Sequence, residues 1–363
     1  MPLSNVDPAS YQQQLAQKAQ RIREQFAEFN PPPLEVHDSP PLHFRQRAEF
    51  KIWHEGTDSY YTMFRPEQPK SPVRIEHFPI GSERLNDVMQ ALMAKILESE
   101  VLRRKLFQLE FLTTLSGEAL VSMIYHRPLD EAWELEARAL QETLSVKIIG
   151  RSKKQKRVLS EDSVMETLTV AGKSYRYQQV ENSFTQPNAT VNQKMLEWAL
   201  RHSKDIGGDL LELYCGNGNF TAVLAQNYNR VLATEISKTS VKSARLNFAT
   251  NGVDNVDIVR MSSEELSSAM DGERPFRRLK DIALSDFKFS TVLVDPPRAG
   301  LDQHTEQVVA RFDHILYISC NPHTLHANLK HLCKTHSIAH FAIFDQFPYT
   351  DHIECGVMLK RTI

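Results

Sequence analysis

The chain has 363 residues, 41% of them hydrophobic and 24% charged, with a formal net charge of −2, and this length and composition suggest about two domains of an ordinary globular protein. No apolar run approaches the ~20 residues that cross a bilayer, and the N-terminus lacks the basic start and apolar core of a signal peptide. The first 180 residues hold equal numbers of basic and acidic side chains, so only local clusters of cations could supply phosphate contacts.

The spacing of the cysteines bears on disulfides, on zinc sites and on the cellular location of the protein. The cysteines stand at positions 215, 320, 333 and 355, without any C-x-x-C spacing. We therefore expect neither a disulfide framework nor a zinc site. The expected location is reducing cytoplasm.

The first 180 residues predict an α+β domain. A polar helix over Tyr11 to Phe29 carries an apolar stripe and is stopped by Asn30-Pro-Pro-Pro33. The pattern beyond it alternates between strand-like and helix-like segments. We expect strands at 44–54, 60–64, 107–115, 119–126 and 146–150, and helices at 86–106 and 133–144.

Two basic runs stand in this region. Arg103, Arg104 and Lys105 form the first, and residues 151–157 hold five cations. A solvated loop is the ordinary interpretation of such runs, and a phosphate-binding edge is the sharper one. Phe107 lies two residues after the first run, where a ring could stack an unpaired base, although a lone phenylalanine more often belongs to the core. We therefore expect the first run to matter more for nucleic acid than the second.

From about residue 181 to 363, strands and helices alternate in the manner of a doubly wound, Rossmann-like α/β domain. In such a domain the loops after the carboxyl ends of the strands form the site. The expected strands are 209–213, 230–235, 256–261, 291–295, 314–319, 338–345 and 355–360, with helices near 191–198, 220–225, 237–251, 303–312 and 323–333.

The first of these loops is rich in glycine. Gly216 and Gly218 follow a buried strand, and Glu235 ends the next strand 19 residues after Gly216. Glycines allow close approach of a ligand, and an acid at this interval suits ribose hydroxyls. Thr221 replaces the third glycine of the dinucleotide pattern and no Walker-type lysine follows, so S-adenosylmethionine is favoured. A glycine turn without a ligand is the alternative.

The second loop is Asp295-Pro-Pro-Arg298. Its prolines hold the backbone extended after a strand, so that Asp295 faces the crevice. Methyltransferases that modify exocyclic amines carry an aromatic residue where Arg298 stands, so amine methylation is disfavoured. The guanidinium suits a phosphate or the carbonyl edge of a pyrimidine, unless it merely pairs with a neighbouring acid.

The third loop is Ser319-Cys-Asn-Pro322, again at a strand end. Cys320 stands just ahead of a helix N-terminus, a position that is expected to lower the pKa of its thiol and favour a nucleophilic thiolate. Single cysteines are usually small buried hydrophobes, which is the interpretation for Cys333 and Cys355. Cys215 is expected to line the cofactor pocket.

The last loop, before the final strand, offers Asp351, His352 and Glu354. Any one of them could serve as a general base. The residues alone do not rank the three.

Taken together, these motifs resemble the RNA 5-methyluridine methyltransferase family. Residues 211–219, 294–298, 318–322 and 352–356 match that family in order and spacing, and Phe184-Thr-Gln-Pro-Asn188 is a further mark. In the N-terminal half, residues 47–54 and 105–108 are similar to the bacterial tRNA (uracil-5-)-methyltransferases. The resemblance covers essentially the whole chain.

The resemblance implies a mechanism and its residues. Cys320 would attack C6 of a flipped uracil, C5 would take the methyl group from S-adenosylmethionine, and Glu354 would remove the C5 proton. Arg298 would face the uracil and Phe107 would stack within the refolded loop. The implied cofactor-binding residues are Gln186, Tyr214, Gly216, Asn219, Glu235 and Asp295.

The implied substrate is the T-loop uridine of tRNA, conventionally position 54, with residues 1–180 as the RNA-recognition domain and 181–363 as the catalytic domain. Relatives that act on ribosomal RNA carry an iron–sulfur cluster on N-terminal cysteines, and this chain has no cysteine before Cys215. We expect no such cluster, no metal, no membrane and no obligate protein partner. Ribosomal RNA or tmRNA as substrate, and an RNA-binding or tRNA-folding protein, are the alternatives; DNA cytosine methylation is a remote one.

Overall fold

The computed structural model describes residues 5–65 and 68–362. The chain forms two compact units, and each unit is made of segments that are not contiguous in the sequence. The first unit comprises residues up to Pro8, Pro40–Thr167 and Gln179–Ala189; the second comprises Ala9–Ser39, Leu168–Gln178 and residues from Thr190 onward. The domain boundary expected at residue 180 stays a prediction, and each unit is considered by itself.

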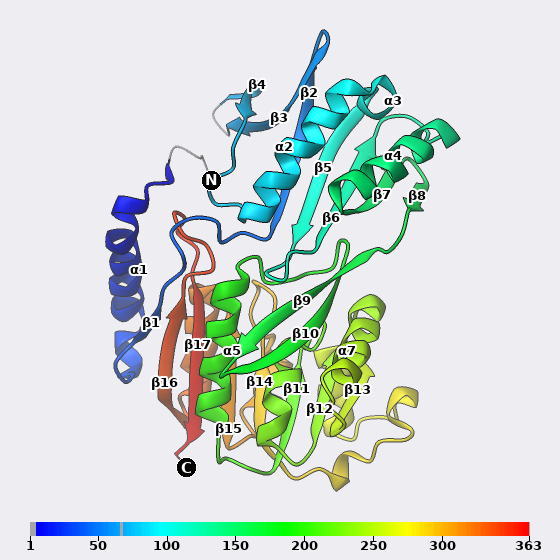
Figure 1. Ribbon diagram of the computed structural model, residues 1–363. Helices are drawn as coiled ribbons and strands as arrows, with labels where there is room; N and C mark the ends of the chain where they lie inside the picture. The colour runs from blue at the N-terminus through cyan, green and yellow to red at the C-terminus, as the bar shows by residue number, and fades with distance from the viewer. Residues whose placement is uncertain (1–4, 66–67, 363) are drawn as a thin grey trace. The chain divides into compact units, whose positions relative to one another are not determined.

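The first unit is built on a seven-stranded sheet in the order β4-β3-β2-β5-β6-β7-β8. The helices α2, α3 and α4 cover one face of this sheet (Figure 1). Its elements are β2 (Arg47–Glu55), β3 (Asp58–Arg65), β4 (Gln68–Ile75), α2 (Glu83–Glu98), α3 (Glu100–Arg103), β5 (Leu106–Thr113), β6 (Ala119–Tyr125), α4 (Glu131–Leu144), β7 (Lys147–Ser152) and β8 (Gln155–Val158). This confirms the expected α+β character.

Two local predictions in this unit were wrong. The helix expected over 86–106 is broken at Ser99, whose hydroxyl accepts from the Leu102 amide at 2.9 Å and so starts the separate helix α3. The basic run 151–157 is not a loop but the hairpin of β7 and β8, turning at Lys154 with φ of 62°. Its charges are largely paired, which a composition argument does not reveal.

A further hairpin has residues in both units. β9 (Ser163–Val170) and β10 (Lys173–Val180) form a two-stranded sheet that the sequence analysis left unassigned. Its turn uses Ala171 and Gly172, both with positive φ.

The second unit contains an eight-stranded sheet in the order β1-β16-β17-β15-β14-β11-β12-β13. Its strands are parallel except β17, which is antiparallel to both neighbours. The elements are α1 (Tyr11–Phe26), β1 (Glu35–His37), α5 (Ala189–Ser203), β11 (Asp209–Leu213), α6 (Thr221–Leu224), β12 (Val231–Glu235), α7 (Lys238–Thr250), β13 (Val256–Arg260), α8 (Ser263–Met270), β14 (Phe289–Val294), α9 (Gln303–Val309), β15 (His314–Ser319), α10 (Pro322–Leu332), β16 (His336–Phe344) and β17 (Glu354–Arg361). The doubly wound prediction is confirmed.

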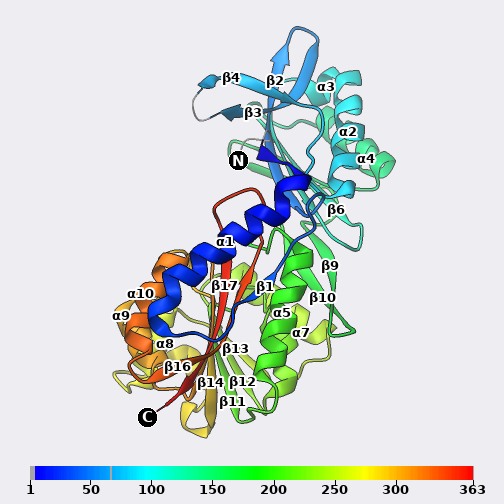
Figure 2. The same ribbon diagram turned by 90° about the vertical axis from the view of Figure 1, so that its left-hand side faces the viewer.

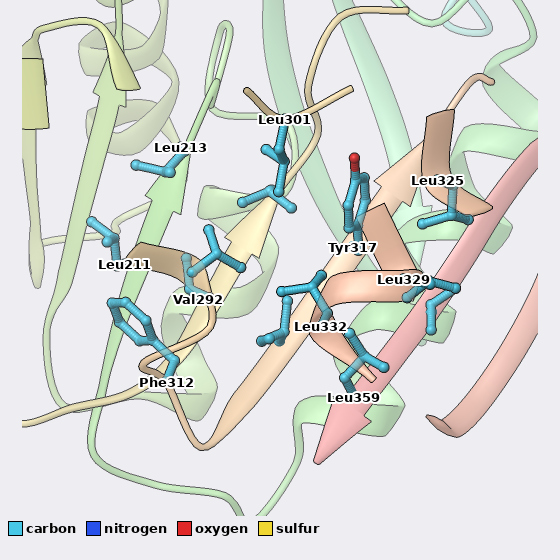
Figure 3. Close-up of a cluster of buried hydrophobic side chains, with 14 of the residues drawn as sticks. Leu211, Leu213, Val292, Leu301, Phe312, Tyr317, Leu325, Leu329, Leu332 and Leu359 are labelled. Carbon is cyan, nitrogen blue, oxygen red and sulfur yellow. The ribbon is translucent and has the colours of Figure 1, made fainter. Parts of the chain in front are cut away.

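Helices lie on both faces of this sheet. Figure 2 shows α5 and α7 on one side and α8, α9, α10 and α1 on the other. Between the sheet and the second layer lies the main hydrophobic cluster, in which Leu211, Val292 and Leu329 are fully buried (Figure 3). This packing fixes the strands and, with them, the loops at their carboxyl ends.

No helix in the described parts of the chain is both long and apolar enough to span a membrane.

Candidate functional site

Strand register brings the predicted loops of the second unit to one edge of the sheet. Leu213 pairs with Val294, Val294 pairs with Tyr317, and Ser319 pairs with Cys355. The residues one step further, Tyr214 after β11, Asp295 after β14 and Cys320 after β15, therefore lie along the same edge. The sheet order reverses direction between β11 and β14, which is where a doubly wound sheet opens a ligand crevice.

Cys320 and Glu354 face each other across this edge. Because β17 runs antiparallel to β15, the first residue of β17 stands beside the residue that follows the last residue of β15. Cys320 is half-buried, and Glu354 is only 4% exposed. The structure thus brings together two residues that are 34 positions apart in the sequence.

The acids at this edge hold their protons tightly. Burial raises the pKa of Glu354 to about 8, with the Asp295 carboxylate adding to the rise and the Arg298 guanidinium opposing it. Burial likewise raises the pKa of Asp295 to about 7. The shared perturbers show that Asp295, Arg298 and Glu354 form one electrostatic cluster, which is a common property of functional sites.

The expectation of a lowered thiol pKa was wrong. Burial raises the pKa of Cys320 to about 11, and the nearby Glu354 and Asp295 carboxylates raise it further, whereas Arg298 lowers it. The helix that follows, α10, does begin at Pro322 as expected. Its N-terminal field is outweighed because desolvation and two like charges all disfavour the thiolate.

The loop that carries Cys320 is tied to the loop that carries Arg298. Asn321 caps α10, since its Oδ1 accepts from the His323 amide at 3.1 Å, and its Nδ2 donates to the Arg298 carbonyl at 2.9 Å. The Thr324 hydroxyl reaches the same carbonyl at 3.3 Å. Arg298 itself is exposed, and its Nη2 lies 3.4 Å from Nδ1 of His352. The guanidinium is therefore available to a ligand, while its backbone is fixed beside the thiol.

The glycine loop is shaped for close approach. Gly216 has φ of 57°, and a side chain there would meet nothing within 4 Å, so open space lies in front of its backbone. Gly218 is required for packing, because a Cβ there would come within 2.5 Å of the Phe248 ring. Tyr214 also has a positive φ of 60°, a strained conformation that aims its side chain away from the strand.

Glu235 is held at this loop by main-chain donors. The Gly216 amide donates to its Oε2 at 3.1 Å, and the Ser237 amide donates to its Oε1 at 2.7 Å. Each carboxylate oxygen keeps a further lone pair for a ligand hydroxyl. The Tyr214 hydroxyl, in turn, donates to Oγ of Ser263 at 2.6 Å.

Asn219 is fixed by a partner that the sequence did not reveal. Its side-chain amide exchanges two hydrogen bonds with Asn192 of α5, both 2.9 Å long. Glu212 was also missed, because it stands inside the apolar run of β11; it is 1% exposed, and burial raises its pKa to about 8. A charged residue within a buried strand was the signal available in the sequence.

The open space at Gly216, the anchored Glu235 carboxylate and the half-buried Asp295 fit a nucleoside with ribose hydroxyls and a charged tail. Two other groups could hold a metal ion by their ligand atoms, Glu35 with His202 and His340, and Asp271 with Glu273 and His304. Neither includes a residue of the strand edge. The expected absence of a metal stays a prediction.

Two predicted site residues belong to the first unit. Gln186 lies in the loop before α5 and is half-buried. Phe107, in β5, stacks on His126 with ring centroids 4.0 Å apart and an interplanar angle of 20°. The Phe107 ring borders a cavity of about 340 Å³ lined by Ile52, His54, Lys105, Leu106, Phe107 and His126.

Comparison with known proteins adds an independent finding. A sequence model of the family described as tRNA (Uracil-5-)-methyltransferase matches residues 10–362. A protein of Saccharophagus degradans named tRNA/tmRNA (uracil-C(5))-methyltransferase is 56% identical over 360 residues, covering 99% of each chain. One of the same name from Cellvibrio japonicus is 58% identical over 358 residues, covering 99% of this chain and 98% of the relative.

The fold is also similar to that of a solved structure, the Pyrococcus abyssi tRNA (uracil-54, C5)-methyltransferase in complex with S-adenosyl-L-homocysteine. The TM-score is 0.73 at 20% identity, over 96% of this chain and 83% of that one. At this identity the likeness concerns the fold, and it confirms the predicted Rossmann-like architecture.

Proposed function

This chain belongs to the tRNA (uracil-5-)-methyltransferase family, and we propose that it methylates C5 of the T-loop uridine of tRNA, conventionally position 54. The enzyme depends on S-adenosylmethionine, in keeping with its family and its fold. The observation that best supports the proposal is the meeting of Cys320 and Glu354 at the sheet edge, beside Asp295 and Arg298. The proposed reaction requires a nucleophile that adds to C6 of uracil and a base that removes the C5 proton, both at one place.

Neutral uracil is too weak a nucleophile at C5 to accept a methyl group unaided. In the proposed mechanism the Cys320 thiolate adds to C6, and the electron pair of the C5–C6 bond moves toward C5 and the C4 carbonyl. S-adenosylmethionine, when bound, would supply the methyl group that C5 takes up and would leave as S-adenosylhomocysteine. Glu354 then removes the C5 proton, and the electrons of the broken C–H bond expel Cys320 from C6 as thiolate.

Arg298 supports this chemistry by its charge. The guanidinium lowers the pKa of both Cys320 and Glu354, so it favours the ionised form that each needs in turn. Its exposed donors suit the carbonyl edge of a uracil. We propose that it faces the flipped base.

The cofactor is proposed to lie along the glycine loop. Glu235 would accept the ribose hydroxyls, and Gly216 would allow the ligand to approach the backbone. Tyr214, Asn219 and Asp295 complete the set in this unit, and Gln186 is also proposed to bind the cofactor.

The first unit is proposed to recognise RNA. Lys105 and Phe107 share a cavity with His126, and Lys51 Nζ lies 5.4 Å from the Phe107 centroid. A ring flanked by cations is the arrangement that stacks an unpaired base. By contrast, Arg151 and Lys156 of the second basic run pair with Glu181. In the first run, Arg103 also pairs with Glu100 and donates to the Gly56 carbonyl. The comparison therefore supports Arg104 and Lys105 as the proposed phosphate contacts.

The test uses unmodified tRNA, labelled S-adenosylmethionine and the purified protein, with a second tRNA whose T-loop uridine is changed to cytidine. Label in the first RNA alone, mapped as 5-methyluridine, would support the proposal. The relatives' names include tmRNA, so tmRNA and ribosomal RNA fragments are tested in parallel. Label in one of these RNAs alone would identify it, and not tRNA, as the substrate. We further propose that the enzyme works in the cytoplasm.

A tRNA-folding role is the second candidate, because the proposed RNA-binding residues of the first unit include none of the proposed catalytic residues. A Cys320→Ala variant that restores the full cellular effect of the wild type would favour it. A variant that fails to do so would leave methylation as the principal function.

A further inference from the structure

A buried ion pair joins α1 to the loop that leads to Glu354. Lys18 Nζ lies 2.7 Å from Oδ1 of Asp345, and the two side chains are only 6% and 1% exposed. Lys18 stands on the apolar face of α1, between Leu15 and Ile22, where a hydrophobic residue would be expected. Asp345 directly follows β16. A charge in this position calls for an explanation, since burying it is costly.

The remaining donors of Lys18 reach the same loop. An ammonium group has three donors, and beyond Asp345 it donates to the carbonyl of Phe347 at 2.9 Å and to that of His352 at 3.0 Å. One cation thus holds the loop over residues 345–353 near both of its ends. Figure 2 shows this loop, between β16 and β17, beside the N-terminal part of α1.

Other α1 side chains contact the loop as well. Arg21, three residues after Lys18 and hence on the same face, donates from Nη2 to the Asp351 carbonyl at 2.7 Å. The Tyr11 ring packs on Tyr349, with centroids 5.8 Å apart, and Tyr349 adopts a positive φ of 63°. Tyr11, Lys18 and Arg21 therefore form a row of contacts, which we call the α1 clamp.

The clamp acts close to the proposed base. Glu354 follows the clamped His352 by two residues, and the intervening Ile353 is buried. Lys18 therefore holds the backbone two residues before Glu354. His352 is also the neighbour of Arg298.

Stability alone does not account for the pair. Hydrophobic residues of similar volume can replace a buried ion pair at little or no cost in stability. A hydrophobic residue in place of Lys18 could not donate hydrogen bonds to the two loop carbonyls. Loss of these hydrogen bonds, with packing preserved, therefore distinguishes a positioning role of Lys18 from a packing role.

We propose that Lys18 is a positioning residue, which acts through the loop over 345–353 to hold Glu354 where it takes the C5 proton. The inference rests on the proposed function, because it concerns the step assigned to Glu354. It predicts a defect in proton removal that is separable from folding, from cofactor binding and from RNA binding.

The experiment compares four variants in single-turnover and steady-state assays on unmodified tRNA. Lys18→Met leaves Asp345 unpaired and will lower stability, so the decisive variant is the double replacement Lys18→Met with Asp345→Leu, which removes both charges. Phe26→Leu is the matched control, because Phe26 lies at the other end of α1 and its ring packs on Phe341, with centroids 5.1 Å apart, and on His326 and Phe29, none of which belongs to the loop.

The proposal expects both Lys18 variants to lose kcat by about 10²-fold, the usual effect of a ~1 Å misplacement, with unchanged KM for tRNA. Methylated RNA should accumulate as a covalent adduct on Cys320, visible on a denaturing gel, because its release awaits proton removal. Phe26→Leu should show neither effect below its unfolding temperature. Lys18→Arg should recover part of the rate.

A double variant with wild-type stability and wild-type kcat would overturn the proposal, since the pair would then be structural only. Hydrogen exchange of the protein without RNA gives a second readout, with faster exchange expected over residues 346–353 in both Lys18 variants and not in Phe26→Leu. Unchanged exchange there overturns the clamp whatever the substrate is. Failure of the wild type to methylate any RNA would refute the proposed function, and the exchange data would still decide the clamp.

Discussion

The pH dependence of the release of methylated tRNA from Cys320 tests the role of Glu354 directly, because Glu354 is proposed to act after the methyl group has been transferred. Its ordinary pKa is 4.5, and burial raises it to about 8. A general base must be ionised to take a proton, so the wild-type rate should rise with pH through this value. Roughly a tenth of Glu354 is ionised at pH 7 and roughly nine tenths at pH 9, which predicts a rise of about tenfold between them.

The measurement is the single-turnover rate at which free methylated tRNA forms from unmodified tRNA, because methyl incorporation alone precedes the step that needs Glu354. The rise should level off above pH 9. A rise governed by Cys320 would continue instead, because burial raises the pKa of that thiol to about 11. Burial lowers the pKa of His352 below its usual value. A rise in the pH–rate profile near pH 8 would therefore not reflect the ionisation of His352.

Two variants complete the test. Glu354→Gln should abolish turnover and leave methylated RNA covalently bound to Cys320. Asp351→Asn, which alters an exposed acid in the same loop, should keep both the rate and the profile. A wild-type rate that is flat between pH 6.5 and 8.5, or an Asp351→Asn variant that traps the adduct, would refute the assignment of the base.

Further predictions follow from the other contacts. Cys320→Ser should lose at least about 10³-fold in rate and form no adduct, while its tRNA affinity in a filter-binding assay stays unchanged. Gly218→Ala should weaken S-adenosylmethionine binding in calorimetry and lower the melting temperature, because its Cβ would meet the Phe248 ring at 2.5 Å and its φ is +80°; equal values in both assays would contradict this. Phe107→Ala should cost ~1–3 kcal/mol of tRNA affinity and leave cofactor affinity intact. Lys105→Glu should weaken tRNA binding at matched salt more than Lys156→Glu, since Lys156 already pairs with Asp162 and Glu181; the reverse order would assign phosphate contact to the second run.

Much of the second unit could be predicted from local patterns. The strand before Gly216 and the strand ending in Glu235 are recognisable because each is a short apolar run next to a residue with special chemistry. The structure places them side by side, with the Gly216 amide on the Glu235 carboxylate. Here sequence spacing and spatial proximity coincide because one βαβ unit contains both residues.

The meeting of Cys320 and Glu354 could not be derived in that way. It depends on β17 entering the sheet antiparallel beside β15, and nothing in the composition of residues 354–361 specifies that direction. The family resemblance pointed to both residues without giving their arrangement. Likewise, the sequence of α1 does not reveal that its buried residues Lys18 and Phe26 belong to the second compact unit.

The thiol prediction failed for a related reason. A helix N-terminus is a local feature that can be recognised in the sequence, and α10 begins where it was expected. The two carboxylates that oppose it come from β17 and from the loop after β14, which are distant in sequence. The pKa of a group depends on all charges near it in space. The direction of a pKa shift therefore cannot be inferred from one element when several elements build the site.

The electrostatic conflict between Cys320 and Glu354 is consistent with the order of the proposed steps. A thiolate and a carboxylate side by side each disfavour the other, and the ligand-free protein keeps both protonated at neutral pH. Attack on C6 moves the negative charge of the thiolate onto the uracil, and uptake of the methyl group neutralises it. No thiolate then opposes ionisation of Glu354 when the C5 proton is taken. Departure of the C5 proton then restores the thiolate only as Glu354 becomes protonated. The mechanism therefore never requires both charges at once, and a single guanidinium, that of Arg298, can support each of them in turn.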